Sequence, residues 1–400
     1  MRAALVHMRH AGTGGTERYL ELVARALGEA GHEAVIVCRS HEALPHPAAR
    51  FEVLRPFAIG GALRLWSFAR AVERHVARNA SSARPYDVVF GLGKTWTHDV
   101  VRLGGGCHAT YLERAHESTR ADWERLVGKG VLKHRLALAA ERRALSPGAY
   151  RAVIANSRMV QRDVVQRYGV PADRVHVVYN GVDLTRFRPD LREGAGLALR
   201  RELGLGDEAL VLLFLGTGYG RKGLAPLLRA FARVADARPT LHLVVVGYDS
   251  RRAHYEQLAR ELGVASRTRF LGGRRDTEVC YAAADLYAVP TWYDPFANTT
   301  LEALASGLPV ITTSGNGAGE LIEEGVEGSV LASEPSADAL EPVLSEWSSR
   351  ERVEGAREAA RALAARHSAA RVAAESIAVL ELVRNEKLAR PAAAQRAASR

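Results

Sequence analysis

The 400-residue sequence predicts an α/β protein built from two Rossmann-like domains, each with a doubly wound parallel sheet. Apolar runs of strand length alternate with segments of 3.6-residue periodicity, and this alternation occurs twice along the chain. The chain is also too long for one ordinary hydrophobic core and suits two domains of roughly 170 to 200 residues. Two such domains imply a cleft, where open α/β sheets bind ligands.

The first half opens with a βαβ unit. A strand is expected at 3–8, a helix at 16–29 and a second strand at 34–38. A longer amphipathic helix is expected at 63–78. The remaining apolar runs of this half predict strands at 51–54, 87–90, 100–103, 152–155 and 175–179.

Turn-forming residues at 180–183 and a later proline separate the halves, and we place a linker there, up to Gly196. The second half restarts with a strand at 210–215, a helix at 224–237 and a strand at 241–246. Further strands are expected at 269–271, 286–289, 310–313 and 329–331. The predicted organisation is a domain at 1–185, a domain at 186–370, a helix near 371–390 that packs back on the first domain, and a disordered tail at 391–400.

The composition, 47% hydrophobic and 25% charged, is that of a soluble globular protein. The longest apolar run, 209–215, is far shorter than the roughly 20 residues of a spanning helix. The N-terminus looks like a first strand and not a signal peptide, so we expect a cytoplasmic protein. Three widely separated cysteines without a CxxC spacing are expected to be reduced thiols, neither disulfides nor zinc ligands.

Basic residues are concentrated in the first half. Residues 1–170 hold 26 Lys and Arg against 15 Asp and Glu, whereas the remaining residues hold 29 against 30. The excess suggests an anionic partner for the first domain, such as a phosphorylated substrate, a membrane surface or nucleic acid. A generally arginine-rich composition explains it equally well.

Two glycine-rich loops each follow a strand and open a helix. In the first, Gly14 and Gly15 would present backbone N–H groups and a positive helix end to a phosphate, although such glycines also serve only to tighten a turn. The second loop contains Gly216 and Gly218 at positions typical of a dinucleotide fingerprint. Its sixth position is Arg221, where a small residue is expected, and this disfavours NAD.

Arg221 and Lys222 are adjacent cations at a helix N-terminus, where the helix dipole disfavours them. A bound diphosphate would neutralise them, and the alternative is a solvated pair. Downstream, Asp294 precedes Glu302 by eight residues, so the two carboxylates can contact different parts of one elongated ligand. The alternatives are a turn or cap role for Asp294 and a solvated helix face for Glu302.

A third glycine-rich loop follows the strand at 310–313 and contains Gly317, Ala318 and Glu320. Three such loops at the carboxyl ends of strands are expected to line one cleft, where open α/β sheets bind ligands.

These residues resemble the retaining glycosyltransferases of family 4, which have the two-domain GT-B fold. The resemblance covers nearly the whole chain. In that family the paired carboxylates are usually two glutamates at the same spacing, and here Asp294 replaces the first. The motifs that carry the resemblance are the early glycine loop, residues 155–157, 179–183 and 220–223, the carboxylate pair and residues 318–320.

The resemblance implies a role for each matching position. Arg221 and Lys222 would bind the donor diphosphate, Glu302 the nucleotide ribose, and Asp294 the hydroxyls of the transferred sugar. The remaining residues implied in donor binding are Gly14, Gly15, Gly216, Gly218, Asn298, Thr299, Gly317, Ala318 and Glu320.

The segment 104–113 is similar to that of enzymes that add the first hexose to heptose in the lipopolysaccharide inner core. On this resemblance His108 would face the acceptor sugar near the reacting centre, and the alternative is a buried structural histidine. Capsule, another glycan, a lipid and a small molecule are the other acceptor classes.

The family resemblance implies transfer with retention of configuration, in which the leaving phosphate helps to deprotonate the acceptor. Negative charge grows on the departing diphosphate, and fixed cations at Arg221 and Lys222 would stabilise it. No Asp-x-Asp motif lies near these loops, so we expect neither a catalytic metal nor a cofactor, with a UDP-sugar favoured as donor.

Basic and apolar residues alternate in the segment 111–143, which predicts peripheral contact with the anionic cytoplasmic face of an inner membrane, or else an ordinary surface helix. Two other functions compete with sugar transfer. A nicotinamide-dependent oxidoreductase also uses Rossmann folds, and the basic half would suit a non-catalytic nucleotide or nucleic-acid binder. No RNA- or DNA-reading motif is present, so we expect no nucleic-acid partner.

Overall fold

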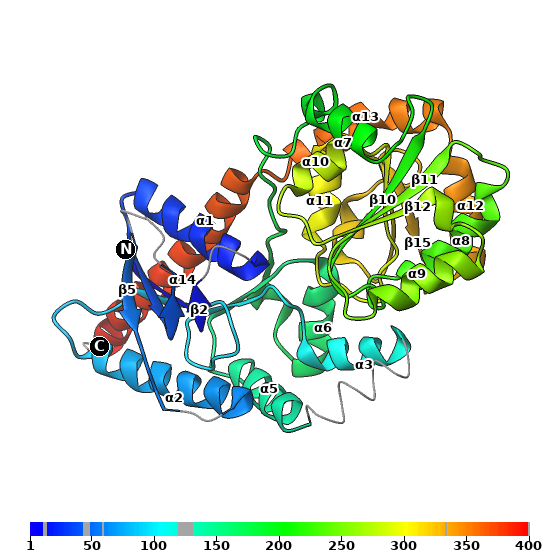
Figure 1. The fold of residues 1–400 in the computed structure, drawn as a ribbon. Coiled ribbons are helices and arrows are strands. Elements are labelled where there is room, and N and C mark those ends of the chain that lie inside the picture. Colours follow the sequence, from blue (N-terminus) through cyan, green and yellow to red (C-terminus); the bar gives the residue numbers. More distant parts are fainter. Residues whose placement is uncertain (11–13, 43–48, 58–59, 119–130, 333, 399–400) are drawn as a thin grey trace. The chain divides into compact units, whose positions relative to one another are not determined.

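The computed structural model describes the chain except for residues 11–13, 43–48, 58–59, 119–130, 333 and 399–400. It divides into two compact units (Figure 1). Unit 1 comprises Met1–Tyr111, Glu124–Tyr179 and Ala370–Arg400. Unit 2 comprises Leu112–Trp123 and Asn180–Ala369.

Unit 1 is built on a seven-stranded parallel sheet in the order β5-β3-β1-β6-β7-β8-β9. The strands β1, β3 and β6 are buried almost throughout, because helices cover both faces of a parallel sheet. The strands are β1 (Arg2–Val6), β3 (Glu33–Cys38), β5 (Ala49–Val53), β6 (Val88–Gly91), β7 (Val100–Leu103), β8 (Ala152–Ala155) and β9 (Val175–Val177), and β2 (Arg9–His10) pairs separately with β4 (Ser40–His41).

Helices of unit 1 pack their apolar stripes on this sheet. In α1, Leu20, Val23 and Leu27 are fully buried at helical spacing. The C-terminal helix α14 adds Val372 and Leu380 to the same core. The helices are α1 (Gly15–Glu29), α2 (Gly61–Ala80), α3 (His108–Ser118, which continues past the unit boundary), α5 (Val131–Ala144), α6 (Arg158–Tyr168), η1 (Ala172–Arg174) and α14 (Ala369–Ala398).

Unit 2 is built on a six-stranded parallel sheet in the order β12-β11-β10-β13-β14-β15. Leu212 and Phe214 of β10 face α8 and α9, and their neighbours in the strand point to the opposite face. Helices cover the sheet on both sides (Figure 1). The strands are β10 (Leu210–Leu215), β11 (Leu241–Val246), β12 (Thr268–Gly272), β13 (Leu286–Val289), β14 (Val310–Thr313) and β15 (Gly328–Leu331).

The helices of unit 2 are η2 (Pro189–Arg192), α7 (Ala195–Glu202), α8 (Leu224–Ala235), α9 (Arg252–Glu261), η3 (Ala265–Arg267), α10 (Thr277–Ala282), α11 (Asn298–Ala305), η4 (Gly317–Leu321), α12 (Ala337–Trp347) and α13 (Arg350–Ala365). Three of them, η4, α12 and α13, begin at a residue whose side chain caps the helix. Ser336 and Ser349, for example, accept hydrogen bonds from the backbone N–H three residues on, at the starts of α12 and α13.

A buried carboxylate anchors the start of unit 2. Asp285 accepts charge-assisted hydrogen bonds from Arg192, Arg200 and Arg357, and also from the backbone N–H of Val211. Its side chain is 2% exposed, so these partners supply the polar contacts that water would otherwise provide. Arg192 lies in η2 and Arg200 in α7. The segment before β10 is therefore fastened to the sheet.

This anchoring corrects the expected linker. Unit 2 begins at Asn180, and the stretch that the sequence assigned to a linker up to Gly196 packs within it. A Cβ on Gly196 would lie 2.5 Å from the carbonyl oxygen of Ala282, so the backbones meet closely there. At the other end, α14 runs to Ala398 and replaces the expected disordered tail with helix, in keeping with the high helix propensity of its alanines.

The three cysteines are buried free thiols, and burial raises the pKa of Cys38 to about 11 and of Cys280 to about 12. Within the described residues, no helix has both the length and the apolar character that a membrane span requires.

Candidate functional site

The order of the strands in unit 2 reverses between β10 and β13, so the chain leaves these neighbouring strands in opposite directions around the sheet. Open α/β sheets bind ligands at such a point, just outside the carboxyl ends of the strands. Two loops leave the sheet here, residues 216–223 after β10 and residues 290–297 after β13. The residues proposed from the sequence for donor binding in unit 2 lie on these loops and on the neighbouring α11 and η4.

Close backbone packing shapes the first loop. Gly223 has φ +80°, and a Cβ there would lie 1.9 Å from the carbonyl oxygen of Pro290. Only glycine fits both the left-handed backbone and the contact with the second loop. Gly216 is approached in the same way, because a Cβ on Gly247 would lie 2.0 Å from its carbonyl oxygen. Gly218 has φ +79° but open space around it.

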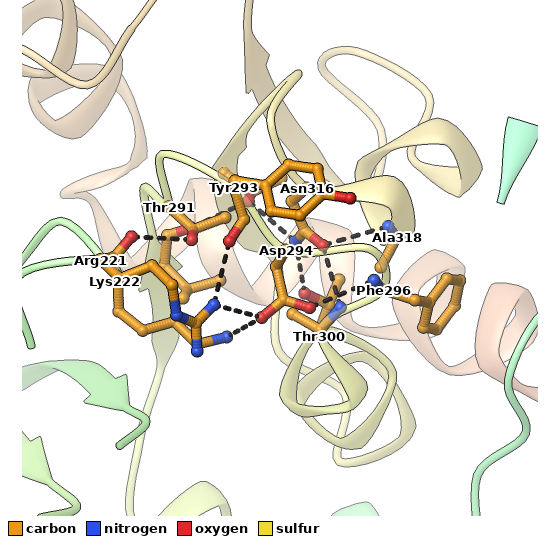
Figure 2. A network of polar contacts seen from close by, with 12 residues as sticks. Arg221, Lys222, Thr291, Tyr293, Asp294, Phe296, Thr300, Asn316 and Ala318 are labelled. Atoms are coloured by element: carbon orange, nitrogen blue, oxygen red, sulfur yellow. Dashed lines mark hydrogen bonds and ion pairs between the residues drawn. The ribbon is translucent and has the colours of Figure 1, made fainter. Parts of the chain in front are cut away.

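A pair of cations from the first loop converges on one carboxylate of the second (Figure 2). Lys222 Nζ lies 2.6 Å from Asp294 Oδ2, and Arg221 Nη1 lies 3.0 Å from the same oxygen. Arg221 also donates to the carbonyl oxygen of Tyr293 at 2.9 Å. The side chains of Lys222 and Asp294 are 8% and 14% exposed, whereas that of Arg221 is 31% exposed. Lys222 is therefore the buried member of the pair, and Arg221 is the more accessible cation.

Hydrogen bonds fix the Asp294 carboxylate in place. Its Oδ1 accepts from the backbone N–H of Phe296 at 3.1 Å, and its own backbone donates to Gly315 and accepts from Gly317. Asn316 holds the loop that follows β14 and is 1% exposed. Its side-chain amide donates to the hydroxyls of Thr300 and Thr312. Hydrogen bonds between protein groups thus fix the position of the Asp294 carboxylate.

Electrostatics keep this cluster ionised. Burial alone would raise the pKa of Asp294, but the charges of Lys222 and Arg221 outweigh it and lower that pKa to about 2. For Lys222, burial and the charge of Arg221 lower the pKa, and Asp294 opposes them. The lowered pKa of Asp294 favours the ion pair, whereas the lowered pKa of Lys222 opposes it. The short contact and the second cation favour the charged carboxylate, so the cluster carries one net positive charge at neutral pH.

Glu302 lies on α11, one helical turn below Asn298. Its Oε2 accepts a hydrogen bond from the hydroxyl of Tyr281 at 2.9 Å, and Tyr281 also donates to the carbonyl of Thr299 at 3.3 Å. Burial and the negative charge of Glu302 hold the pKa of Tyr281 well above its usual range, so this hydroxyl stays a donor. Asn298 accepts from the side-chain amide of Asn180 at 2.6 Å.

Backbone N–H groups of the third loop already have partners within unit 2. The backbone N–H of Gly317 donates to the carbonyl of Asp294 at 2.9 Å. That of Ala318 donates to Asn316 Oδ1 at 3.1 Å, as Figure 2 shows. The N–H of Gly317 therefore holds the second loop, whereas the N–H of Ala318 is bonded within its own loop. Glu320 follows them in η4 and is exposed.

Sequence reasoning missed two residues of this site. Asn316 precedes the glycine-rich run as an Asx cap, a signal that the sequence does contain. Tyr281 lies 21 residues from Glu302 in the sequence, and no local pattern links them.

Unit 1 holds the other residues proposed from the sequence. Gly14 has φ +119° at the start of α1, and a Cβ there would lie 2.1 Å from Glu17 Oε2. The Glu17 carboxylate therefore folds back over the helix start beside Gly14 and Gly15, where an anion was expected, and lies 3.7 Å from the ring of His7.

His108 begins α3, and both of its ring nitrogens are engaged. Nδ1 lies 3.0 Å from Lys94 Nζ, and Nε2 lies 3.0 Å from His134 Nδ1. Burial, together with the charges of Lys94 and Lys133 and the neighbouring His134, lowers the pKa of His108 to about 4. The imidazole is therefore neutral, and it contacts side chains of its own unit. Among the described residues, no group of three His, Cys, Asp or Glu side chains could hold a metal ion.

Two family models match the chain. "Glycosyltransferase Family 4" matches residues 13–186, and "Glycosyl transferases group 1" matches residues 197–364. Each model matches a little under half of the chain. Arg221, Lys222, Asp294 and Glu302 all lie in the part that matches the group 1 model.

Curated relatives match part of this chain. An uncharacterized glycosyltransferase of Methanocaldococcus jannaschii is 34% identical over 204 residues, which is 50% of this chain and 52% of the relative. A D-inositol 3-phosphate glycosyltransferase of Thermomonospora curvata is 38% identical over 200 residues, 46% of each chain. The chain thus spans about half the length of the curated relatives that it matches.

Solved structures show that the whole chain has the GT-B fold. WaaG, a glycosyltransferase involved in lipopolysaccharide biosynthesis, superposes with a TM-score of 0.76 at 23% identity, over 94% of this chain and 99% of that one. HepE of Anabaena, in complex with UDP and glucose, gives 0.68 at 21% identity over 95% and 99%. The prediction of two Rossmann-like domains of the GT-B type is confirmed.

Proposed function

We propose that the protein transfers a hexose from a nucleotide-diphosphate sugar to an acceptor glycan. One observation carries this proposal: two cations and a carboxylate from separate loops meet at the switch point of the unit 2 sheet, in the part of the chain that matches the glycosyltransferase group 1 model. Positive charge fixed at this point stabilises the diphosphate as it leaves. The complex of HepE with UDP-glucose, a protein of the same fold, favours a UDP-sugar as donor.

The cluster suggests how binding proceeds. Asp294 neutralises one of the two cations, so a diphosphate gains the most by pairing with Arg221, whose side chain is the more exposed. Asp294 then keeps a bond to Lys222 and offers its other oxygen to a sugar hydroxyl. Glu302, oriented by Tyr281, is left to accept from the hydroxyls of the ribose.

Retention of configuration and independence of a metal ion belong to this proposal. Arg221 and Lys222 supply the positive charge that a divalent cation supplies in other transferases. We assign no covalent nucleophile. Proton removal from the acceptor falls to the leaving phosphate, because neither nitrogen of His108 is available as a base.

The acceptor that we favour is the heptose of a lipopolysaccharide inner core. The superposition with WaaG, which takes part in lipopolysaccharide biosynthesis, supports this choice. The D-inositol 3-phosphate glycosyltransferases among the relatives support a phosphorylated small-molecule acceptor as the alternative.

A mass-spectrometric screen tests the transfer reaction. UDP-, GDP- and ADP-sugars are each incubated with truncated core oligosaccharides and with inositol phosphate, with and without EDTA. We expect a single hexose added from a UDP-sugar at a rate that EDTA leaves unchanged, and an α-linked product from an α-linked donor by NMR. Absence of product with every pair would contradict the proposal, and an inverted anomer would remove the retaining mechanism.

Attachment of unit 1 to the cytoplasmic face of the inner membrane is a further part of the proposal. Phe57, Leu63 and Leu132 are 87%, 53% and 60% exposed on or beside the contacting helices α2 and α5, among exposed arginines such as Arg64 and Arg135. Residues 119–130 of the amphipathic segment lie outside the described residues. We expect sedimentation with anionic liposomes that is lost with neutral ones, and equal sedimentation with both would remove this part.

A further inference from the structure

Unit 1 has its own switch point, and Lys94 lies there. The order of its sheet reverses between β1 and β6, and Lys94 is in the loop that leaves the carboxyl end of β6. This place is equivalent to that of Asp294 in unit 2, where the loop after β13 leaves the sheet beside β10. Ligands of open α/β sheets bind at such points, so the surroundings of Lys94 are a candidate site by position alone.

A directed chain of hydrogen bonds holds Lys94. A lysine ammonium can only donate, so His108 Nδ1 accepts from Lys94 Nζ over 3.0 Å. The proton of the neutral ring is then on Nε2, which donates to His134 Nδ1 over 3.0 Å. The two imidazoles are nearly parallel, with 5.2 Å between centroids, and Tyr111 stacks on His108 at 5.9 Å. This arrangement orients both rings and leaves two ammonium protons of Lys94 that do not bond His108.

Partial burial lowers the pKa of the Lys94 ammonium, and the nearby charge of Glu141 opposes this shift. Among the described residues, no carboxylate forms a salt bridge with Lys94. The nearby acid, Glu141, is committed elsewhere: both of its oxygens accept from the backbone N–H of His108, at 2.7 and 3.0 Å, and one accepts from the hydroxyl of Tyr168. Lys133, next to His134 on α5, is exposed and adds a second positive charge.

We propose that Lys94, held by His108 and His134 and assisted by Lys133, binds a phosphoryl group carried by the acceptor. Two cations match a phosphate dianion, and the ammonium protons of Lys94 that do not bond His108 supply donors for its oxygens. The assignment of this group to the acceptor rests on the function proposed above. In this arrangement His108 is a positioning residue: it orients the ammonium and does not itself remove a proton.

The histidines report on the site directly, without any transfer reaction. We would record the imidazole NMR signals of the full chain while inorganic phosphate replaces chloride at constant ionic strength, near pH 7. A phosphate beside Lys94 shields the positive charge that lowers the pKa of His108. We expect saturable shifts of the His108 and His134 signals, with the buried His98 of the same unit unchanged as a reference for the fold.

Two matched variants separate this site from the donor site, which also attracts phosphate. Lys94→Gln is expected to weaken the affinity reported by His108 and His134 at least tenfold, and Lys222→Gln is expected to leave it unchanged. A wild-type protein without saturable shifts overturns the proposal. So do equal shifts in Lys94→Gln, because these mean an adventitious ion only. Neither result bears on sugar transfer, which the mass-spectrometric screen tests separately.

Discussion

The two units place a lysine beside the switch point of each sheet and stabilise it in different ways. In unit 2, Lys222 is buried and lies 2.6 Å from a carboxylate that a second cation shares. In unit 1, Lys94 is exposed and lies 3.0 Å from a neutral imidazole. The buried cation needs a counter-charge because its desolvation is costly, whereas Lys94 keeps contact with water even though partial burial lowers its pKa.

This difference suggests different uses. A charge that is already compensated inside the protein is pre-organised to stabilise the extra charge of a transition state, with little reorganisation. A charge that is only oriented, as that of Lys94 is, attracts and positions an anionic group in the ground state. Loss of the charges around Lys222 should therefore lower both stability and activity. Loss of the charge of Lys94 should affect binding without affecting stability.

The largest expected effect comes from removal of the carboxylate. Asp294→Asn leaves Lys222 buried without a counter-charge and is expected to lower the free energy of unfolding by about 3–5 kcal/mol. Chemical denaturation followed by fluorescence measures this. Asp294→Glu keeps the charge and serves as the control, with a smaller loss. Equal losses for the two variants would mean that the ion pair is not what stabilises this loop.

The next effect concerns turnover. Lys222→Ala is expected to lower the transfer rate by roughly tenfold to a thousandfold, about 1.4–4 kcal/mol, because charge on the leaving diphosphate loses its buried partner. Initial rates at saturating donor measure it. Lys387→Ala removes a lysine that pairs with Asp99 in unit 1, and we expect it to keep its rate. An unchanged rate in Lys222→Ala would refute the assigned role.

Two glycines of the same loop give a smaller, matched effect. Gly218→Ala and Gly223→Ala both place a side chain at positive φ, which costs about 1–2 kcal/mol. Gly223→Ala also brings a Cβ against the carbonyl of Pro290, whereas Gly218 has open space. We therefore expect thermal unfolding to show the greater loss for Gly223→Ala, together with weaker UDP binding. Equal melting temperatures would contradict the close contact of the two loops.

The smallest effect is a difference in acid stability. Burial lowers the pKa of His98 and of His108 in unit 1 to about 4, so their contribution to stability is present above about pH 6.5 and is lost as the pH falls toward 4. In unit 2 the pKa of Asp294 is about 2, so its contribution is lost only below about pH 3.8.

Hydrogen exchange followed by mass spectrometry compares the two units at pH 7 and pH 5. Unit 1 is expected to lose protection at the lower pH while the strands of unit 2 keep theirs. Loss of protection in unit 2 first would contradict this difference. The surroundings of His242 on β11 are left out of the comparison, because burial lowers the pKa of that histidine as well.

Much of the fold was predictable because strands of parallel sheets are buried on both faces. A run such as that of β10, with six consecutive apolar residues, indicates a strand without any partner being known. The two-residue strands β2 and β4 carry no such signal. The anchored segment before β10 was misread as a linker because its arginines acquire partners only through Asp285, which lies more than 80 residues away.

The candidate site was predictable in membership and not in detail. Loop position relative to the strands brought Arg221, Lys222 and Asp294 together as proposed. The sequence could not indicate that Asp294 would bind both cations, since that contact joins residues more than 70 positions apart. Nor could it indicate that the N–H groups of Gly317 and Ala318 were already satisfied, because this depends on where the Asn316 side chain and the Asp294 carbonyl lie.

A crystal structure of the chain soaked with UDP tests the central claim most directly. The account predicts the diphosphate at the loop 216–223, with Arg221 turned from Asp294 to a phosphate oxygen, Lys222 within 4 Å of the diphosphate, and the ribose hydroxyls on Glu302. Nucleotide density in any other part of the molecule, or a diphosphate that touches neither cation, would contradict it.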